Sequence, residues 1–430
     1  MYKLPFIDFK MKSMNPRVAP VINPANSEPV MQNFLQNHNP MNPFAVTKMN
    51  IATMNAITNI PPQYFNGSQL LELYNVPSVT PSSSSIKKTT IAIIIAYTYP
   101  GLLNDLKTYW TNSINFGIKS TPPKVNVYTM PGAKQNTAWA EEECLDVQVV
   151  CTINPNANIW VVEAKSDTVT DLMAAIQYAS NTIKADVISM SWGGMDNKAF
   201  ANFNNNFTNT SICYCASSGD THFASWPAVS SNCMAVGGTT LLWTPNAEDP
   251  RTEYTWNGAG CGYSISTLQP NYQKNITTIK HKYRVIPDLS LVANPQSSIY
   301  TVYKGKWAGV GGTSVAAPIM AGMLSIANQM RFNDGKSALT TVYTSTPSIA
   351  TSDAYIPPSN NVQNHLYKTV TPNARLYNDV FYNITIGADS GSVEGNSNKL
   401  TTYYASDNFD IPTGLGSPNC KHLCDSLLTL

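Results

Sequence analysis

Short apolar runs alternate with helix-like stretches over most of the chain after residue 89. The runs are rich in β-branched residues and have no polar face, which is typical of parallel strands covered on both faces. This order predicts an α/β fold with a mainly parallel central sheet flanked by helices on both faces. We expect strands at 90–97, 124–129, 158–164, 186–191, 212–216 and 234–236, and helices at 137–150, 170–182 and 315–330.

Two further segments add to this pattern. Residues 68–74 have helical spacing, and two late strands, at 298–303 and 307–310, flank the hairpin turn Lys304-Gly305-Lys306. Residues 1–60 are rich in Asn, Pro and Met and show little periodicity, so we expect a poorly ordered N-terminal extension there. The domain proper is predicted to span 61–430.

The composition excludes some classes of partner. The chain has 430 residues, of which 12% are charged, and 27 basic residues stand against 26 acidic ones. Such a chain produces no strong field, which argues against nucleic acid as a partner. The longest apolar run, Ile91–Tyr97, is far shorter than the ~20 residues of a membrane span, and no signal peptide is evident. We expect a globular monomer and leave its compartment open.

Eight cysteines are too few for a disulfide scaffold in a chain of this length. Cys213 and Cys215 occupy alternate positions of a predicted strand, and Cys420 and Cys424 lie on one face of a helix. A zinc clip is disfavoured because the usual paired spacing of cysteine and histidine is absent.

The segment Gly311–Pro318 contains a candidate nucleophile. Its glycines allow a sharp turn, Ser314 falls at a helix start, and Pro318 is expected in the first turn, where a proline does little harm. The helix dipole and the serine's own N–H would then stabilise an oxyanion beside it. Plain N-capping by Thr313 or Ser314 explains the same residues equally well.

A serine hydroxyl needs a base, and two carboxylates could supply it. Glu142 and Asp146 are four residues apart in the predicted helix 137–150 and therefore share one face. Because like charges repel, one carboxyl should keep a proton while the other is ionised. We predict that Glu142 accepts the serine proton and that Asp146 orients it. A solvated acidic face is the alternative, and we prefer it for Glu141 and Glu143.

Asp220 directly follows the predicted strand 212–216, at the sheet edge where α/β proteins place their ligand-facing loops. A protonated Asp220 would donate a hydrogen bond to an oxyanion, whereas an Asx-turn is the simpler explanation. Histidine is the usual base for serine, but the histidines of this chain lie in unsuitable settings. His222, two residues past Asp220, is kept as a minor alternative base.

These motifs together resemble the sedolisin, or serine-carboxyl peptidase, family. The resemblance rests on Glu142-x-x-Leu145-Asp146, Ser218-Gly219-Asp220 and Gly312-Thr313-Ser314-x-x-x-Pro318, and it covers residues from about 62 to the end. Further landmarks agree in order: Val187–Gly193, Trp226–Ala228, Ala235–Thr239, Pro287–Ser290 and Thr413–Pro418. The resemblance implies a subtilisin-like fold, a Ser314-Glu142-Asp146 triad and Asp220 in the oxyanion hole. It also implies hydrolysis of polypeptides at acid pH through an acyl-enzyme.

Members of this family also hold a calcium ion near the C-terminus. Asp410 matches the family's later aspartate, and with it come the backbone carbonyls of Ser406 and Asn408. The first pair of ligands falls on Asn383 and Ile384, with Asn in place of Asp, which removes one charge. Tyr377–Val380 is an alternative match that keeps an aspartate, Asp379, but loses the rest of the motif.

The chain also departs from the family. Typical members carry a long folded pro-segment, which we do not expect in residues 1–60, and Asn294 stands where the family has an aspartate. Family members are usually secreted or lysosomal. A second hypothesis therefore remains: a peptidase-like binding or structural protein that keeps the site without using it.

Overall fold

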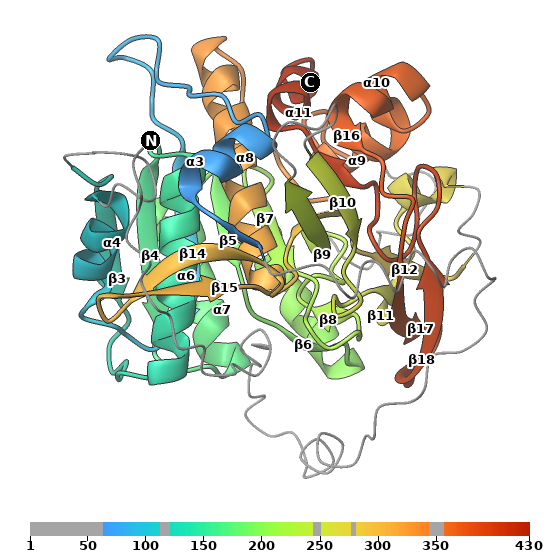
Figure 1. Ribbon diagram of the computed structural model, residues 1–430, viewed down its shortest axis with the longest axis horizontal. Helices are drawn as coiled ribbons and strands as arrows, with labels where there is room; N and C mark the ends of the chain where they lie inside the picture. The colour runs from blue at the N-terminus through green and yellow to red at the C-terminus, as the bar shows by residue number, and fades with distance from the viewer. Residues whose placement is uncertain (1–62, 112–120, 244–250, 277–280, 344–356) are drawn as a thin grey trace, which may run out of the picture.

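A large, mainly parallel sheet forms the centre of the molecule (Figure 1). The computed structural model describes residues 63–111, 121–243, 251–276, 281–343 and 357–430, and the predicted extension at 1–60 lies outside these ranges. The strand order is β10-β9-β7-β5-β2-β4-β3, with β13 also paired to β9. The strands are β2 (Thr90–Ala96), β3 (Val125–Thr129), β4 (Asn158–Ala164), β5 (Val187–Met190), β7 (Cys213–Ser217), β9 (Cys233–Trp243), β10 (Arg251–Thr255) and β13 (Leu289–Val292). β10 pairs antiparallel with β9, and the other pairs along this order are parallel.

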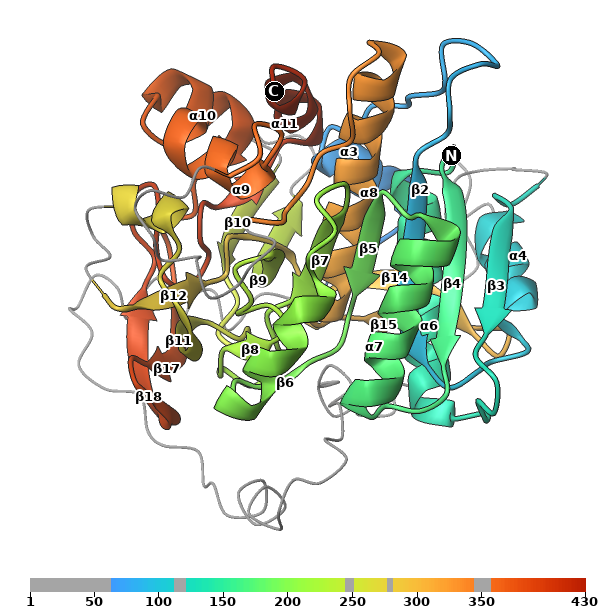
Figure 2. The same cartoon turned by 180° about the vertical axis from the view of Figure 1, so that it is seen from behind.

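Helices cover both faces of this sheet, as the two opposite views in Figures 1 and 2 show. On one face, α6 (Thr137–Ile153) and α8 (Thr313–Asn333) lie side by side, and α8 contacts β5, β7, β9 and β13. The shorter helices α3 (Gly67–Leu73), α4 (Leu102–Thr111) and α11 (Cys420–Leu427) pack against these two. On the other face, α7 (Val169–Tyr178) contacts β2 and β4 and continues into a π-helical turn, η1 (Ala179–Ile183).

Continuous apolar character explains the central elements. All seven residues of β2 are buried, since the strand has helices above and below it. α6 begins at the N-cap Asn136, whose side chain accepts hydrogen bonds from the backbone N–H groups of Ala138 and Trp139. Residues 142–153 of α6 are all buried, because the sheet, α4 and α8 surround this helix.

Smaller sheets lie at the edges of the molecule. The hairpin β14 (Ser297–Tyr303) and β15 (Lys306–Val310) pairs with β1 (Gln63–Phe65), and Asp105 of α4 accepts hydrogen bonds from the backbone N–H groups of Lys304 and Gly305 at its tip. A four-stranded sheet has the order β12 (Tyr283–Ile286), β11 (Gly262–Leu268), β17 (Ala388–Val393), β18 (Asn396–Tyr404). The remaining elements are β6 (Gly194–Met195), β8 (Ser225–Trp226), β16 (Phe381–Tyr382), β19 (Ser417–Pro418), α9 (Val362–His365), α10 (Ala374–Val380), η2 (Lys198–Asn206), η3 (Asn271–Asn275) and η5 (Leu366–Val370).

The predicted fold class is confirmed, with boundaries that differ by a few residues in most elements. β9 is much longer than the predicted strand 234–236 because it continues past the sheet edge to pair with β10. All eight cysteines are buried free thiols, which agrees with strand and helix packing. Among the described residues, no helix combines the length and apolarity that a bilayer crossing requires.

Candidate active site

Ser314 lies in the first turn of α8, where the chain leaves a glycine turn. Gly312 is the N-cap residue and has a φ of 120°, a conformation that side chains rarely adopt. The Thr313 hydroxyl donates to Asp220, and the Ser314 hydroxyl donates to the carbonyl oxygen of Ser191 at 3.3 Å. Neither hydroxyl caps the helix, so the interpretation of these residues as a plain N-cap is wrong.

Pro318 does not lie in the first turn of α8 as predicted, and it removes a helical hydrogen bond to Ser314. α8 starts at Thr313, so Pro318 is the sixth helical residue and lies beyond the first turn. A proline has no N–H, and the carbonyl oxygen of Ser314 therefore lacks its usual helical donor four residues later. The Ser191 hydroxyl donates to this carbonyl at 3.3 Å instead. Ser191 and Ser314 thus share two hydrogen bonds, in each of which the hydroxyl of one residue donates to the backbone carbonyl of the other.

The predicted acid pair lies on α6, beside this contact. Glu142 and Asp146 are both buried, at 9% and 0% exposure, so the solvated-face alternative is wrong for them. Burial raises the pKa of Asp146 well above its ordinary value, the charge of Glu142 raises it further, and the nearby Ser191 hydroxyl opposes the rise. Neither carboxyl oxygen of Asp146 has a hydrogen-bond partner of standard geometry in the described part of the chain. A buried carboxyl in such surroundings favours its protonated form.

A second acidic pair, which the sequence did not reveal, adjoins the first. Glu143 is 1% exposed, so its assignment to a solvated face is wrong. Burial, together with the charge and a side-chain hydrogen bond of Glu163, raises the pKa of Glu143 well above its ordinary value, and Asp146 adds to this. Glu163, at the end of β4, accepts hydrogen bonds from the side chains of Thr98 and Thr129. The available signal was a lone acidic residue near the end of a largely apolar strand.

Asp220 is tied to the beginning of α8. Its Oδ1 accepts a hydrogen bond of 2.8 Å from the backbone N–H of Thr313 and one of 2.6 Å from the Thr313 hydroxyl. The backbone N–H of Gly219 donates to the same hydroxyl. Oδ1 is therefore directed to the beginning of α8. The carboxyl is held one residue away from Ser314.

His222, the minor alternative base, is engaged elsewhere. Its Nδ1 lies 3.0 Å from Oδ1 of Asp389 on β17, and 41% of its side chain is exposed.

The contacts described above bring five of these residues together at the carboxyl end of the parallel strands, which is the lower edge of the sheet in Figure 1. They are Ser314, Ser191, Asp146, Glu142 and Asp220.

The residues predicted to bind calcium form two hydrogen-bonded pairs. The backbone N–H of Asn408 donates to Oδ1 of Asn383, and that of Ser406 donates to Oδ2 of Asp410. Ile384 is buried next to Asn383, and Asp410 is a carboxyl of 4% exposure. Calcium prefers such a set of carboxylate, amide and carbonyl oxygens, so the residues present fit this ion. The Tyr377 hydroxyl lies within hydrogen-bond distance of Oδ1 of Asn383 and of the carbonyl oxygen of Asn408.

The alternative match at Tyr377–Val380 is less suited to the ion. Asp379 is an exposed residue of α10, and its backbone carbonyl accepts a hydrogen bond from His422.

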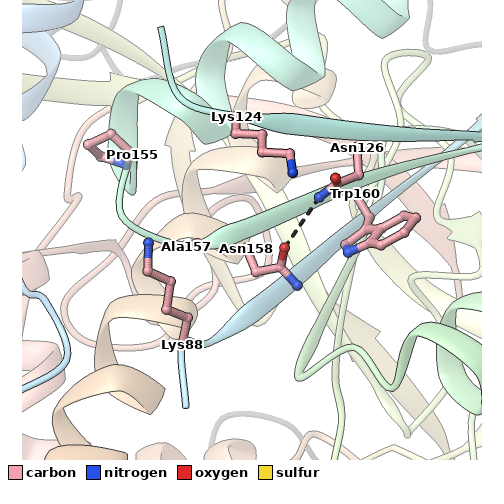
Figure 3. A pocket seen from close by; sticks show the side chains of 7 residues that line it. All are labelled: Lys88, Lys124, Asn126, Pro155, Ala157, Asn158 and Trp160. Carbon is pink, nitrogen blue, oxygen red and sulfur yellow. Dashed lines mark hydrogen bonds between the residues drawn. The ribbon is translucent and has the colours of Figure 1, made fainter. Parts of the chain in front are cut away.

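A separate hollow of about 440 Å³ lies at the opposite end of the sheet (Figure 3). Lys88, Lys124 and Asn158 line it near the amino ends of β2, β3 and β4, and the amide of Asn126 donates to Asn158. It contains none of the predicted site residues, and so it is not part of the candidate active site.

Comparison with known proteins identifies the family. The model of the subtilase family of S8 peptidases matches residues 129–378, more than half of the chain. Sedolisin of Pseudomonas sp. is 33% identical over 144 residues, which are 30% of this chain and 24% of that protein. Kumamolisin of Bacillus sp. is 27% identical over 318 residues, 66% of this chain and 50% of that protein. The chain thus spans half or less of the length of these curated relatives.

A solved structure extends the likeness in fold. Pseudomonas sedolisin, a serine-carboxyl proteinase complexed with two molecules of pseudo-iodotyrostatin, superposes with a TM-score of 0.62 at 23% identity. The match covers 85% of this chain and 98% of that one, which confirms the subtilisin-like fold. The chain therefore belongs to the subtilase family and, within it, to the sedolisin group.

Proposed function

We propose that this chain is a serine-carboxyl endopeptidase that hydrolyses polypeptides in acid. The observation that carries the proposal is the double contact of Ser191 with Ser314, next to the buried carboxyl of Asp146. It joins a hydroxyl at a helix N-terminus to an acidic pair, with Asp220 held one residue away. In this arrangement no histidine is needed to activate the serine.

Acylation begins when Ser314 attacks the scissile carbonyl. The Ser314 side chain turns from the Ser191 carbonyl toward ionised Glu142, and its proton passes to Glu142 as Oγ bonds to the carbonyl carbon. The carbonyl π electrons move to the oxygen, where neutral Asp220 and the backbone N–H of Ser314 donate hydrogen bonds. Protonated Asp146 donates to Glu142 and orients it.

The tetrahedral intermediate then collapses to the acyl-enzyme. Glu142 gives its proton to the departing amine nitrogen, and the C–N bond breaks. Water attacks the acyl carbon in the same way, with Glu142 as base, and Glu142 finally returns a proton to Oγ of Ser314. The products are a new carboxyl terminus and a new amino terminus.

Calcium belongs to this proposal as a structural ion. Asn383 and Asp410 would hold it with their side chains, together with the carbonyls of Ile384, Ser406 and Asn408. Bound there, it would neutralise buried negative charge and join the segment after β16 to the loop after β18.

Incubation with a denatured protein at about pH 4 separates this proposal from a catalytically silent protein. The expected result is cleavage by the wild type, together with a covalent acyl-enzyme detectable by mass spectrometry after an acid quench. The Ser314→Ala variant should show neither. Properly folded wild type that cleaves nothing at about pH 4 or about pH 7.5 would favour the silent protein.

A further inference from the structure

The loop that carries Asp220 is attached at a second point, through His222. Nδ1 of His222 lies 3.0 Å from Oδ1 of Asp389, which belongs to β17 of the four-stranded sheet. The Asp389 side chain is fully buried, and its Oδ2 has no hydrogen-bond partner in the described ranges. His222 is therefore the side-chain partner that the structure gives this buried carboxyl, and a buried polar group without such a partner is unfavourable.

The backbone of His222 has an unfavourable conformation, which the contact of its side chain with Asp389 helps to stabilise. Its φ is 67°, in the left-handed region that non-glycine residues seldom adopt. Burial raises the pKa of Asp389 to about 7, and the His222 hydrogen bond opposes this rise. The same hydrogen bond raises the pKa of His222 above its ordinary value. Each group favours the charged form of the other, but burial outweighs this for Asp389, whose carboxyl keeps its proton in acid.

Backbone hydrogen bonds place the rest of the loop between two segments. The carbonyl oxygen of Gly219 accepts from the N–H of Gly260, and that of His222 accepts from the N–H of Cys261. The N–H of Ala224 donates to the side chain of Ser392 on β17. One end of the loop is thus bonded to α8 through Asp220 and Thr313, and the other end is bonded to β17.

We propose that His222 and Asp389 form a positioning pair, which fixes this loop so that Asp220 stays directed at the oxyanion beside Ser314. This inference rests on the proposed function. An oxyanion donor acts only when its geometry is already set, and a displacement of about 1 Å is enough to lose much of its effect. His222 acts through Asp220 and is not itself a catalytic residue.

The test compares two substitutions of His222 in the full chain. His222→Gly removes the pair but suits the left-handed backbone, whereas His222→Asn keeps both a donor and a residue type tolerated there. We expect His222→Gly to lower kcat about 10- to 100-fold with KM changed less than about twofold, and His222→Asn to recover most of the loss. His281→Ala is the matched control, because it removes another histidine–carboxylate pair, His281–Glu394, and it should leave kcat unchanged.

A double-mutant cycle separates positioning from a general structural role. In an Asp220→Ala background, His222→Gly should cost less than about twofold in kcat, since the group that it positions is already missing. Fully additive losses would overturn the proposal. A fall of His222→Gly to the level of Ser314→Ala would also overturn it, because His222 would then be the base.

A measurement independent of activity tests the pair itself. NMR titration of the His222 ring in the Ser314→Ala variant should give a pKa above the ordinary histidine value. In the double variant that also carries Asp389→Asn, the pKa of His222 should be lower. An unshifted His222 would contradict the pair even in an active enzyme. A shifted His222 in a wild type that cleaves nothing would support the pair but contradict the proposed peptidase.

Discussion

Asp220 differs from the acidic pair in both its exposure and its contacts. Glu142 and Asp146 are buried within α6, whereas Asp220 is half-buried on a loop and bonds to the first residue of α8. This difference suits different roles: a buried pair that shares a proton, and a carboxyl at the surface of the site that meets the substrate oxygen.

Replacement of Asp220 tests its role as an oxyanion donor. Asp220→Ala should lower kcat by roughly 10²–10³, the usual cost of losing such a donor, with little change in KM. Asp167→Ala, which removes another half-buried carboxyl from the same end of the sheet, is the control and should keep wild-type kcat. A loss below about threefold for Asp220→Ala would exclude the role.

Ser314, Asp220 and the pair Glu142 and Asp146 were predicted from their sequence context, but the burial of Glu143 and the contact of His222 were not. Residues after the strands of a parallel sheet gather at one edge, so the convergence of Asp220 with Ser314 follows from the fold class. The burial of Glu143 does not, because α6 is enclosed on almost all sides and leaves no exposed acidic face. The contact of His222 with Asp389 joins residues far apart in the chain, which local patterns do not encode.

At the level of elements, the beginning of α8 is shaped by a proline that removes a hydrogen bond. Pro318 leaves the carbonyl of Ser314 without its helical donor, and Ser191, which follows β5, supplies one. The sequence predicted both elements but placed Pro318 two positions too early in its helix, because the exact start of a helix is poorly defined by sequence.

This exchange of donors can be measured by a double-mutant cycle on stability. Ser191→Ala should lower the free energy of unfolding by about 1–3 kcal/mol, since it leaves a buried carbonyl without a partner. With Pro318→Ala also present, residue 318 regains an N–H, and the cost of Ser191→Ala should shrink. Urea denaturation of the four proteins in a Ser314→Ala background checks this. Equal costs with and without the proline would show that the Ser191 hydrogen bond is unrelated to Pro318.

The proposed calcium site joins the segment after β16 to the loop after β18. Because a ligand that binds the folded state stabilises it, removal of calcium with a chelator should lower the melting temperature. Asn383→Asp restores the charge and should increase the gain in melting temperature with added calcium, whereas Asp410→Asn should abolish that gain. Magnesium at the same concentration is the control. A melting temperature independent of calcium in both the wild type and Asn383→Asp would exclude the site.

For the whole molecule, several buried carboxyls favour a more stable fold in acid. Burial raises the pKa of Glu143, Asp146 and Asp389, so the folded state keeps protons that the unfolded chain releases between about pH 4 and pH 7. The free energy of unfolding should therefore fall as pH rises through this range, by up to about 1.4 kcal/mol per pH unit for each extra proton held. His365, whose burial lowers its pKa, opposes this in part.

Urea denaturation of the Ser314→Ala variant at several pH values measures this trend without self-digestion. Asp389→Asn should flatten the decline toward pH 7, since it removes one of the responsible groups. A stability that increases steadily up to pH 7 would contradict the assignment of these carboxyls.

The central sheet was predictable because its buried strands are continuous apolar runs. The four-stranded sheet was not, since β11, β17 and β18 contain many polar residues and are defined by pairing across long stretches of chain. This sheet carries Asp389, so the missed part of the fold and the missed part of the site share one cause.

The most direct test of a serine activated by a proton-sharing acidic pair is a pH–activity profile of the wild type beside Ser314→Ala. Asp146 must keep its proton and Asp220 must be neutral, so kcat/KM should be highest in acid and fall as pH rises toward about 7.5. Ser314→Ala should be inactive throughout. Wild-type activity that increases through neutral pH, as expected for a serine activated by histidine, would contradict this account.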